Sequence, residues 1–248
     1  MIMQNRKDEV WKSRLTIEKY LTDIRKAMPL AAEQIEVMMR LISATQKPVI
    51  SFLDLGCGDG ILAAAILEKY PEAKGVLLDF SDPMIEAARK KLKDYVPNLD
   101  FMTLDYADSH WLDSVSKMAP FDVIVSGFSI HHQSDKKKQE LYGEIYNVLK
   151  PGGIFLNIER VSSPTRWIES VFEEYFIDSL YNMHLAENSQ KTRSQVAEEF
   201  RNRPDKEANI LAPVETQCDW LRRIGFSDVD CYFKIFELAV FGGRRPLK

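Results

Sequence analysis

The stretch Phe52-Leu53-Asp54-Leu55-Gly56-Cys57-Gly58-Asp59-Gly60 decides the fold of this chain. An apolar run that begins at Val49 ends inside it, and three glycines then alternate with other residues. A helical pattern follows from Ile61. A buried strand, a tight glycine turn and the N-terminus of a helix together form a site for a nucleotide-bearing ligand. Residues 49–61 therefore predict such a site.

Length and composition indicate an ordinary globular protein. The 248 residues suit one large domain, or one domain with a sizeable insertion. Apolar residues make up 45% of the chain and charged residues 28%, which leaves ample material for a core. The 33 basic residues against 37 acidic ones give a net charge of −4. This balance does not favour a nucleic-acid partner.

Cysteine usage and the chain's polar start bear on the compartment. Cys57, Cys218 and Cys231 lie far apart without CxxC spacing. They are interpreted as reduced thiols of a cytoplasmic protein, with neither a disulfide framework nor a metal site. The first eleven residues are polar and charged, unlike a signal peptide. No apolar run approaches the roughly 20 residues of a membrane span, so no membrane association is expected.

Short apolar runs alternate with helical patterns between residues 48 and 159. The predicted strands cover 49–55, 75–79, 99–104, 121–126 and 154–158, and the predicted helices cover 61–70, 82–93 and 135–149. The strands are continuous apolar runs, so both faces of their sheet should be covered. This alternation predicts an α/β fold with a doubly wound, mainly parallel sheet.

The chain closes with a helical pattern over 214–224, a stop at Gly225 and two strands at about 229–233 and 236–241. Strands so close in sequence cannot be joined by a parallel crossover, so the pair must be antiparallel. We expect four regions, which are an N-terminal helical arm (1–47), a cofactor-binding core (48–159), a helical lid (160–210) and the closing helix with its hairpin (211–248). The lid, with a long aromatic stripe, is where substrate specificity is expected.

Acidic residues end three successive predicted strands at Asp54, Asp79 and Asp105. Because parallel strands end at one rim of the sheet, the three carboxylates should lie near one another. Asp79 is placed to accept hydrogen bonds from both hydroxyls of a ribose. Asp105 could accept from an adenine amine, with Phe80 and Tyr106 flanking the ring. Asp54 would face a polar, positively charged tail of the ligand.

The chain here resembles the class I S-adenosylmethionine-dependent methyltransferases. The resemblance rests on residues 54–60, Asp79, Asp105 and Leu149-Lys150-Pro151-Gly152-Gly153. Residues 121–132, from Phe121 through Ser126-Gly127-Phe128-Ser129-Ile130-His131-His132, look like the small-molecule branch, since the Asn/Asp-Pro-Pro-aromatic motif of base-modifying enzymes is missing. The resemblance covers residues 48–159 well and the closing helix and hairpin acceptably, whereas nothing specific covers the lid.

The resemblance implies a Rossmann-like sheet of seven strands whose last strand is antiparallel. It implies S-adenosyl-L-methionine as cofactor and S-adenosyl-L-homocysteine as product. The expected cofactor-binding residues are Asp54, Gly56, Cys57, Gly58, Asp79, Phe80, Met84, Asp105, Tyr106, Ser126 and Gly127. The expected partner is a small-molecule substrate, and the oligomeric state stays open, a homodimer included.

A narrower resemblance connects residues 157–160 and 213–217 to the carboxy-S-adenosylmethionine synthases. In that group an arginine near the methyl site pairs with the carboxylated cofactor. Residues 209–212 of this chain contain no arginine, and Gly127 stands where a polar residue is usual. Ordinary S-adenosylmethionine is therefore favoured. Two further alternatives are a non-catalytic S-adenosylmethionine-binding protein and an NAD-dependent dehydrogenase. An NAD-dependent dehydrogenase typically has a GxGxxG turn and no antiparallel hairpin at the end of its sheet, unlike this sequence.

No catalytic residue is assigned from the sequence, because methyl transfer from a sulfonium can rely on proximity and alignment. The candidates for lining the substrate pocket are His131, His132, Glu159 and Arg160, with His132 a possible base if the acceptor must lose a proton. The basic runs at 136–138 and 90–91 are interpreted as solvated helix faces.

Overall fold

A computed structural model describes residues 7–108 and 110–247. Seven strands form one mixed sheet in the order β3-β2-β1-β4-β5-β7-β6. The strands are β1 (Ser51–Leu55), β2 (Lys74–Asp79), β3 (Leu99–Thr103), β4 (Phe121–Gly127), β5 (Leu149–Arg160), β6 (Ser227–Ile235) and β7 (Leu238–Arg244). β7 runs antiparallel to both β5 and β6, whereas the pairs from β3 to β5 are parallel. The predicted doubly wound sheet with an antiparallel ending is confirmed.

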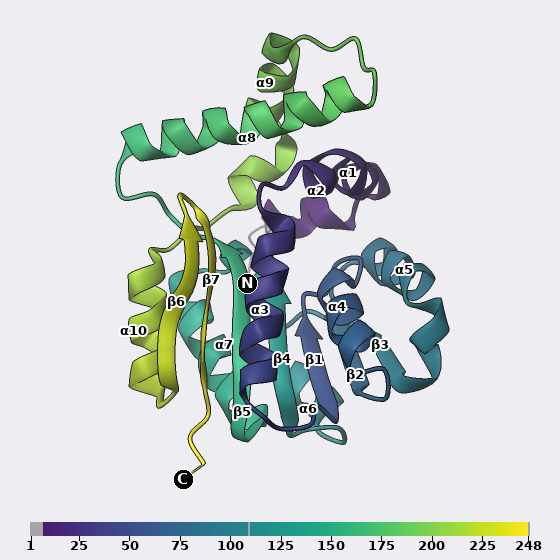
Figure 1. Ribbon diagram of the computed structural model, residues 1–248, viewed down its shortest axis with the longest axis vertical. Helices are drawn as coiled ribbons and strands as arrows, with labels where there is room; N and C mark the ends of the chain where they lie inside the picture. The colour runs from purple at the N-terminus through teal and green to yellow at the C-terminus, as the bar shows by residue number, and fades with distance from the viewer. Residues whose placement is uncertain (1–6, 109, 248) are drawn as a thin grey trace, which may run out of the picture.

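Helices cover both faces of the sheet, as the continuous apolar strands require (Figure 1). One face packs on α3 (Ala31–Ala44), α4 (Ile61–Lys69) and α5 (Asp82–Lys91), where Ile42, Ile66 and Ala88 are fully buried. The other face packs on α6 (Trp111–Val115), α7 (Asp135–Val148) and α10 (Val214–Ile224). Alternate residues of each strand therefore enter two separate cores.

The strand order reverses between β1 and β4, which lie side by side although β2 and β3 separate them in sequence. In sheets of this type a crevice opens at the carboxyl ends of the strands at that point. The glycine turn follows β1, and residues 128–132 follow β4. The sequence therefore brings both segments to the same rim.

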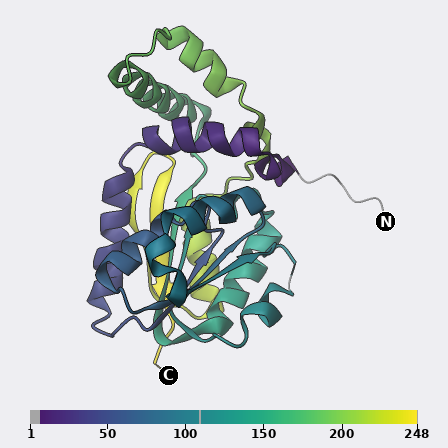
Figure 2. The same ribbon diagram turned by 90° about the vertical axis from the view of Figure 1, so that its right-hand side faces the viewer.

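Two groups of helices lie beyond this rim (Figures 1 and 2). The N-terminal arm contains the 3-10 segment Lys7–Lys12, α1 (Arg14–Lys19), the π-helical segment Tyr20–Ile24 and α2 (Arg25–Ala27). The segment after β5 contains α8 (Arg166–Ala186), α9 (Arg193–Arg201) and the 3-10 segment Pro204–Ala208. The two groups share a third apolar cluster, in which Ala27 packs with α8 residues such as Phe172 and Ile177.

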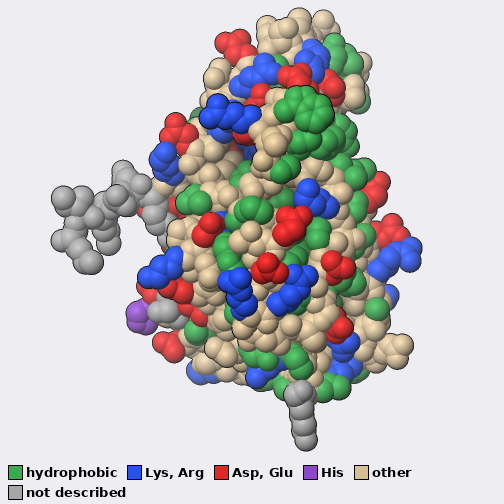
Figure 3. Space-filling model, turned by 90° about the vertical axis from the view of Figure 1, so that its left-hand side faces the viewer, with side chains coloured by type: hydrophobic (Ala, Val, Ile, Leu, Met, Phe, Trp, Pro, Cys, Tyr) green, Lys and Arg blue, Asp and Glu red, His purple; other side chains and the backbone are tan. Residues whose placement is uncertain are grey.

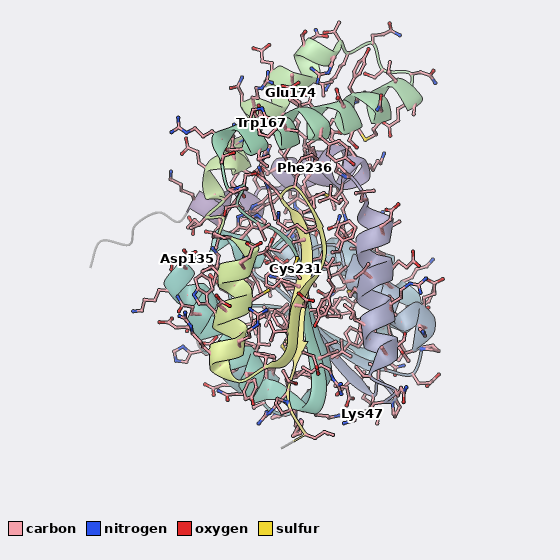
Figure 4. The ribbon with its side chains drawn as sticks, turned by 60° about the vertical axis from the view of Figure 1, so that its left-hand side comes forward. Lys47, Asp135, Trp167, Glu174, Cys231 and Phe236 are labelled. Carbon is pink, nitrogen blue, oxygen red and sulfur yellow. The ribbon has the colours of Figure 1, made fainter. Side chains whose placement is uncertain are left out.

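The tip of the β6–β7 hairpin reaches this third cluster. Phe236 lies below α8, the helix that carries Trp167 and Glu174, while Lys47 lies at the opposite end of the sheet (Figure 4). Trp167 is 71% exposed. Hydrophobic side chains also gather in the upper part of the face shown in Figure 3.

α6 and the start of β5 differ from the sequence-based expectations. α6 was not predicted, because its five residues are too few to reveal a helical period. β5 begins at Leu149, earlier than expected, since a register shift opposite Phe121 accommodates the Pro151-Gly152-Gly153 turn within the strand. The closing helix has the predicted bounds, and Gly225 ends it in the left-handed conformation at φ 116°.

None of the helices in the described residues is both long enough and apolar enough to cross a bilayer.

Candidate functional site

The glycine turn is held against the end of β2 by its backbone. The amides of Gly56 and Cys57 both donate to the carbonyl of Leu78, at 2.7 and 3.0 Å. Gly56 and Gly58 have φ values of +70° and +53°, which side-chain-bearing residues seldom adopt. A Cβ on Gly58 would meet only the Met84 sulfur, at 4.0 Å. The backbone at Gly58 therefore borders open space that a ligand can approach closely.

Asp79 connects this turn to the start of α5. Its Oδ2 accepts from the Gly58 amide and its Oδ1 from the Ser81 amide, both at 2.9 Å. Burial raises the pKa of Asp79 to about 6, although these backbone donors favour the charged form. Each carboxylate oxygen retains a lone pair, so the group can still accept from a ligand.

Asp54 lies deeper, below the start of α4. It is fully buried, and its Oδ2 accepts from the Ala63 amide at 3.1 Å. Its Oδ1 has no hydrogen-bond partner among the described residues. Burial raises the pKa of Asp54 well above its ordinary range, and burial likewise raises the pKa of the Cys57 thiol. Both groups lie beside the glycine turn, where the Cys57 thiol donates to the Gly58 carbonyl and Asp54 Oδ1 alone is left without a partner among the described residues.

The cavity that most of the predicted site residues line, here called the main cavity, has a volume of about 880 Å³. Its walls come from the glycine turn, the end of β2, the segment after β4, the N-terminal arm and the segment after β5. The predicted site residues on its walls are Gly56, Gly58, Asp79, Phe80, Met84, Gly127, His131, His132 and Arg160. The fold thus brings six of the eleven cofactor candidates and three of the four substrate-pocket candidates to one cavity.

Two further cavities adjoin the main one. The turn cavity, about 900 Å³, is lined by Asp54, Cys57 and Arg25 and shares Gly56, Gly58 and Gly127 with the main cavity. The arm–lid cavity, about 750 Å³, lies between the N-terminal arm and α8 and α9 and shares Trp11, Tyr20 and Phe200 with the main cavity. One glycine turn therefore borders both the main cavity and the turn cavity.

His131 and Glu159 form a coupled pair at the wall of the main cavity. His131 Nδ1 lies 2.5 Å from Glu159 Oε1, and the His131 backbone amide donates to Oε2 at 3.0 Å. The Arg160 amide adds a third hydrogen bond to Glu159, at 2.8 Å. Glu159 is fully buried and does not itself line the cavity. It orients the imidazole of His131, which does.

The two remaining substrate-pocket candidates are also anchored. The His132 ring packs against the His131 ring with centroids 4.0 Å apart and planes tilted by 49°, and His132 Nδ1 lies 3.2 Å from the Ala208 carbonyl. Arg160 Nε donates to the buried Glu237 at 2.7 Å. Both side chains therefore present fixed surfaces to the cavity.

Three predicted cofactor residues, Asp105, Tyr106 and Ser126, do not line these cavities. Asp105 Oδ1 accepts from the Ala107 amide at 2.8 Å, and Ser126 Oγ donates to the Leu55 carbonyl at 2.7 Å. Tyr106 is buried beneath the glycine turn with its hydroxyl 2.7 Å from Ser129 Oγ, and burial raises its pKa. Their predicted roles stay predictions.

Several cavity residues were not recognised as site residues in the sequence. Trp11 and Tyr20 appeared only as scattered apolar positions, and Arg203 only as part of a polar stretch. Arg203 has a side chain 10% exposed, donates to Asp205 at 3.1 Å, and lies over the Phe200 ring. No local pattern marks these residues, because the tertiary fold brings them to the rim.

One sequence interpretation is wrong. Lys138 was expected on a solvated face, but it is 1% exposed. Its ammonium group donates to Asp135 Oδ1 at 2.8 Å and to the Ile210 carbonyl. Lys136 is 88% exposed, as expected. The run reads as uniformly basic, but the packing of residue 210 against α7 buries Lys138. Lys137, with a side chain 14% exposed, pairs with Glu144 at 3.2 Å.

Comparison with known proteins identifies the core of the site. Residues 52–153, from β1 to the Pro151-Gly152-Gly153 turn, match the family model described as "Methyltransferase domain". Residues 52–153 are a methyltransferase domain of the S-adenosylmethionine-dependent family. S-adenosylmethionine is the cofactor of this family. The open space at Gly58, the acceptor Asp79 and the unpartnered Oδ1 of Asp54 fit that cofactor.

The relatives of this methyltransferase carry different activity names, and they match different lengths of its chain. Carboxy-S-adenosyl-L-methionine synthase of Campylobacter lari is 22% identical over 220 residues, which cover 88% of this chain and 87% of that protein. Malonyl-[acyl-carrier protein] O-methyltransferase 1 of Ilyobacter polytropus is 33% identical over 107 residues, covering 43% of this chain and 37% of that protein. The solved structure of PigF with SAH superposes with a TM-score of 0.61 at 18% identity. It covers 98% of this chain, which spans 63% of PigF.

Proposed function

We propose that the protein transfers the methyl group of S-adenosylmethionine to a small molecule bound in the main cavity. The observation that carries this proposal is the composition of one cavity wall. The cofactor candidates Gly58 and Asp79 lie on it together with His131, Arg160 and Arg203. A methyl donor and an acceptor bound there would share one water-restricted space, as in-line transfer requires.

The cofactor supplies a methyl carbon already activated by its sulfonium, so the protein's task is to position the acceptor and take up its proton. We assign the proton to His131. With Nδ1–H donating to Glu159, the neutral imidazole keeps a lone pair on Nε2. An acceptor O–H or N–H loses its proton to Nε2 while the new bond to carbon forms and the carbon–sulfur bond breaks. His131 replaces His132 as the preferred base, since Glu159 would also stabilise the imidazolium.

The remaining walls suggest the class of acceptor. Phe176 and Phe200 supply aromatic surface, while Arg160 and Arg203 supply positive charge. Such a wall favours an acceptor with an apolar body and an anionic group. Residues 160–210 then act as the lid that sets specificity, with the N-terminal arm forming the opposite wall.

A second candidate is the formation or use of a carboxylated cofactor. Relatives named carboxy-S-adenosyl-L-methionine synthase cover 88% of this chain. No arginine occurs in residues 209–212, but Arg160 and Arg203 reach the main cavity from elsewhere in the chain. Either guanidinium could pair with a carboxylate next to the methyl site.

Two measurements test these proposals. The purified protein is first denatured, and the mass of any released nucleoside separates S-adenosylmethionine from its carboxylated form. Labelled methyl transfer from S-adenosylmethionine into small-molecule fractions of a cell extract is then compared for the native protein and His131→Asn. We expect transfer by the native protein only, with equal calorimetric affinity of both for S-adenosylhomocysteine. A folded protein that binds no S-adenosylhomocysteine contradicts the proposal, and binding without transfer in any fraction favours a non-catalytic binding protein.

We also propose a cytoplasmic location. It is supported by three thiols, Cys57, Cys218 and Cys231, which form no disulfide.

A further inference from the structure

The arm–lid cavity continues from the main cavity, on the side away from the glycine turn. Its boundary with the main cavity, here called the neck, consists of the residues that line both: Trp11, Tyr20, Ile24, Phe200, Arg203 and Asp205. Neither the glycine turn nor Asp79 lines the arm–lid cavity. The arm–lid cavity therefore extends the acceptor side of the main cavity, beyond the reach of the cofactor candidates.

The walls of the arm–lid cavity come from two parts of the chain that face each other beyond the rim (Figure 1). Leu15 of α1 lies on the arm side, and Leu180 of α8 and Val196 of α9 lie on the other. Leu180 and Val196 are buried, and apolar atoms supply most of the cavity surface. Such a surface suits an apolar ligand, because contact with it removes apolar area from water.

The solvent side of the arm–lid cavity is bridged by one ion pair. Lys19 of α1 lies 3.6 Å from Glu199 of α9, and the two side chains are 56% and 41% exposed. Exposed pairs of this kind contribute little to stability. The contact between the arm and α9 at this side can therefore give way when a ligand enters between them.

The neck carries a hydrogen-bond donor that is not used. Trp11 Nε1 is buried and has no hydrogen-bond partner among the described residues. Its ring contacts Tyr20 edge-on, with centroids 5.1 Å apart, and lies 5.8 Å from the ring of His132. Buried N–H groups without an acceptor are uncommon, because burial removes their hydrogen bonds to water. A ligand oxygen at the neck would satisfy this donor.

Positive charge is held at the same neck. Arg203 Nε donates to Asp205 at 3.1 Å, and its Nη1 donates to the Phe200 carbonyl at 2.7 Å. These two contacts fix the guanidinium where the two cavities meet. An anionic group of a ligand that spans both cavities would therefore lie beside Arg203 and Trp11.

We propose that the arm–lid cavity holds an apolar chain of the methyl acceptor. The acceptor is then an elongated molecule with its reactive group beside His131, an anionic oxygen that accepts from Trp11 Nε1 at the neck, and a chain between α1 and α8. The inference rests on the proposed function, since it assumes that the acceptor occupies the main cavity. It narrows the acceptor class from a small molecule with an apolar body to one with an extended chain.

A series of straight-chain carboxylates tests the proposal on the native protein. Hexanoate, octanoate, decanoate and dodecanoate, each below its micelle concentration, are titrated calorimetrically with S-adenosylhomocysteine at saturation. The carboxylate would occupy the neck and the chain the arm–lid cavity. Because each buried methylene adds apolar area, we expect affinity to rise about three- to fourfold per added CH2.

Filling the arm–lid cavity from its own wall should abolish this gain. Thr16 of α1 lines that cavity and not the main one, so the indole of Thr16→Trp would take the place of the chain. We expect dodecanoate binding to weaken more than about tenfold and hexanoate binding to change less than about threefold. Thr22→Trp is the matched control, because Thr22 is exposed and its hydroxyl donates only within the arm, to the carbonyls of Glu18 and Lys19. It should change neither affinity.

The outcomes separate this inference from the proposed function. Equal affinities from hexanoate to dodecanoate, or no binding of any carboxylate, would overturn the inference. So would dodecanoate binding that Thr16→Trp leaves unchanged, since the chain would then lie elsewhere. All three results leave the proposed function standing as long as S-adenosylhomocysteine binds. A native protein that binds no S-adenosylhomocysteine contradicts the proposed function, and the inference falls with it.

Discussion

The imidazole of His131 is held 2.5 Å, Nδ1 to Oε1, from the carboxylate of Glu159, which no solvent reaches. Glu159 ends β5, whereas His131 follows β4, so the contact spans two neighbouring strands at the rim of the sheet. A buried acid that accepts three hydrogen bonds fixes one histidine ring at the cavity wall. This pair distinguishes His131 from His132, which the sequence alone could not do.

We expect Glu159→Gln to lower the free energy of unfolding by about 1–3 kcal/mol. The single side-chain oxygen of the new glutamine can accept from only some of the His131 and Arg160 donors. Its NH2 group, itself a donor, would face the remaining donors. Urea unfolding checks this. Glu140→Gln is the control, because Glu140 is half exposed and pairs weakly with Lys136 at 3.8 Å. Equal stability of both variants would show that the buried pair is not structurally important.

Asp79 should make stability depend on pH. Burial raises its pKa to about 6 in the folded state, above the unfolded value of about 3.9. The folded protein therefore binds this proton more tightly, and its stability falls as pH rises from about 4 to about 6, by at most about 3 kcal/mol. Asp79→Asn removes this contribution. The stability of the native protein minus that of the variant, measured by urea unfolding across pH 4–7, should decline over that window. A flat difference would contradict the buried environment of Asp79.

Alanine at the two glycines of the turn should have separable effects. A Cβ on Gly56 would lie 2.0 Å from Ser129 Oγ, so Gly56→Ala should destabilise the fold by about 2 kcal/mol or more. A Cβ on Gly58 meets nothing closer than 4.0 Å, so Gly58→Ala should cost only the backbone strain of about 1–2 kcal/mol.

The added methyl of Gly58→Ala would project into the space proposed for the cofactor. We therefore expect Gly58→Ala to lose more free energy of S-adenosylhomocysteine binding, measured by calorimetry, than free energy of unfolding, measured by thermal unfolding. If Gly58→Ala binds as the native protein does, the turn does not approach the ligand closely.

The first and last residues of the lysine run of α7 should differ in their effect on stability. Lys138→Met removes the donor to the Ile210 carbonyl and to Asp135, and should destabilise the fold by about 1–3 kcal/mol. Lys136→Met, two residues away and 88% exposed, should change stability by less than about 0.5 kcal/mol. Urea unfolding of the two variants compares them directly. A larger effect at position 136 would contradict the burial pattern.

The glycine turn and the positions of Asp54 and Asp79 beside it were predictable because their signals are local. The glycine turn, Asp79 and the strand ends follow from runs of a few residues, and parallel strands necessarily end at one rim. Asp54 and Asp79 occur beside the turn as expected. The closing hairpin was also predictable from the sequence, because two strands so close in the chain can pair only antiparallel. β6 and β7 pair in this way.

The lysine run and the histidine pair show where prediction from neighbouring residues alone was insufficient. Lys136 and Lys138 look equivalent in the sequence, and so do His131 and His132. Their difference arises from Ile210 and Glu159, which are 72 and 28 residues away in the chain. Burial and partnership across such distances leave no periodic signal.

By itself the sequence determined the seven-stranded sheet, the glycine turn and the acids at its rim, because strand period, turn chemistry and strand direction are encoded locally. Only the tertiary structure brought Arg25 of the arm and Arg203 of the segment after β5 to the cavities beside that turn. The physical reason is that the arm and α8 bury their apolar faces against each other, through Ala27 and Phe172. That burial, which no short stretch records, positions the charged residues opposite the glycine turn.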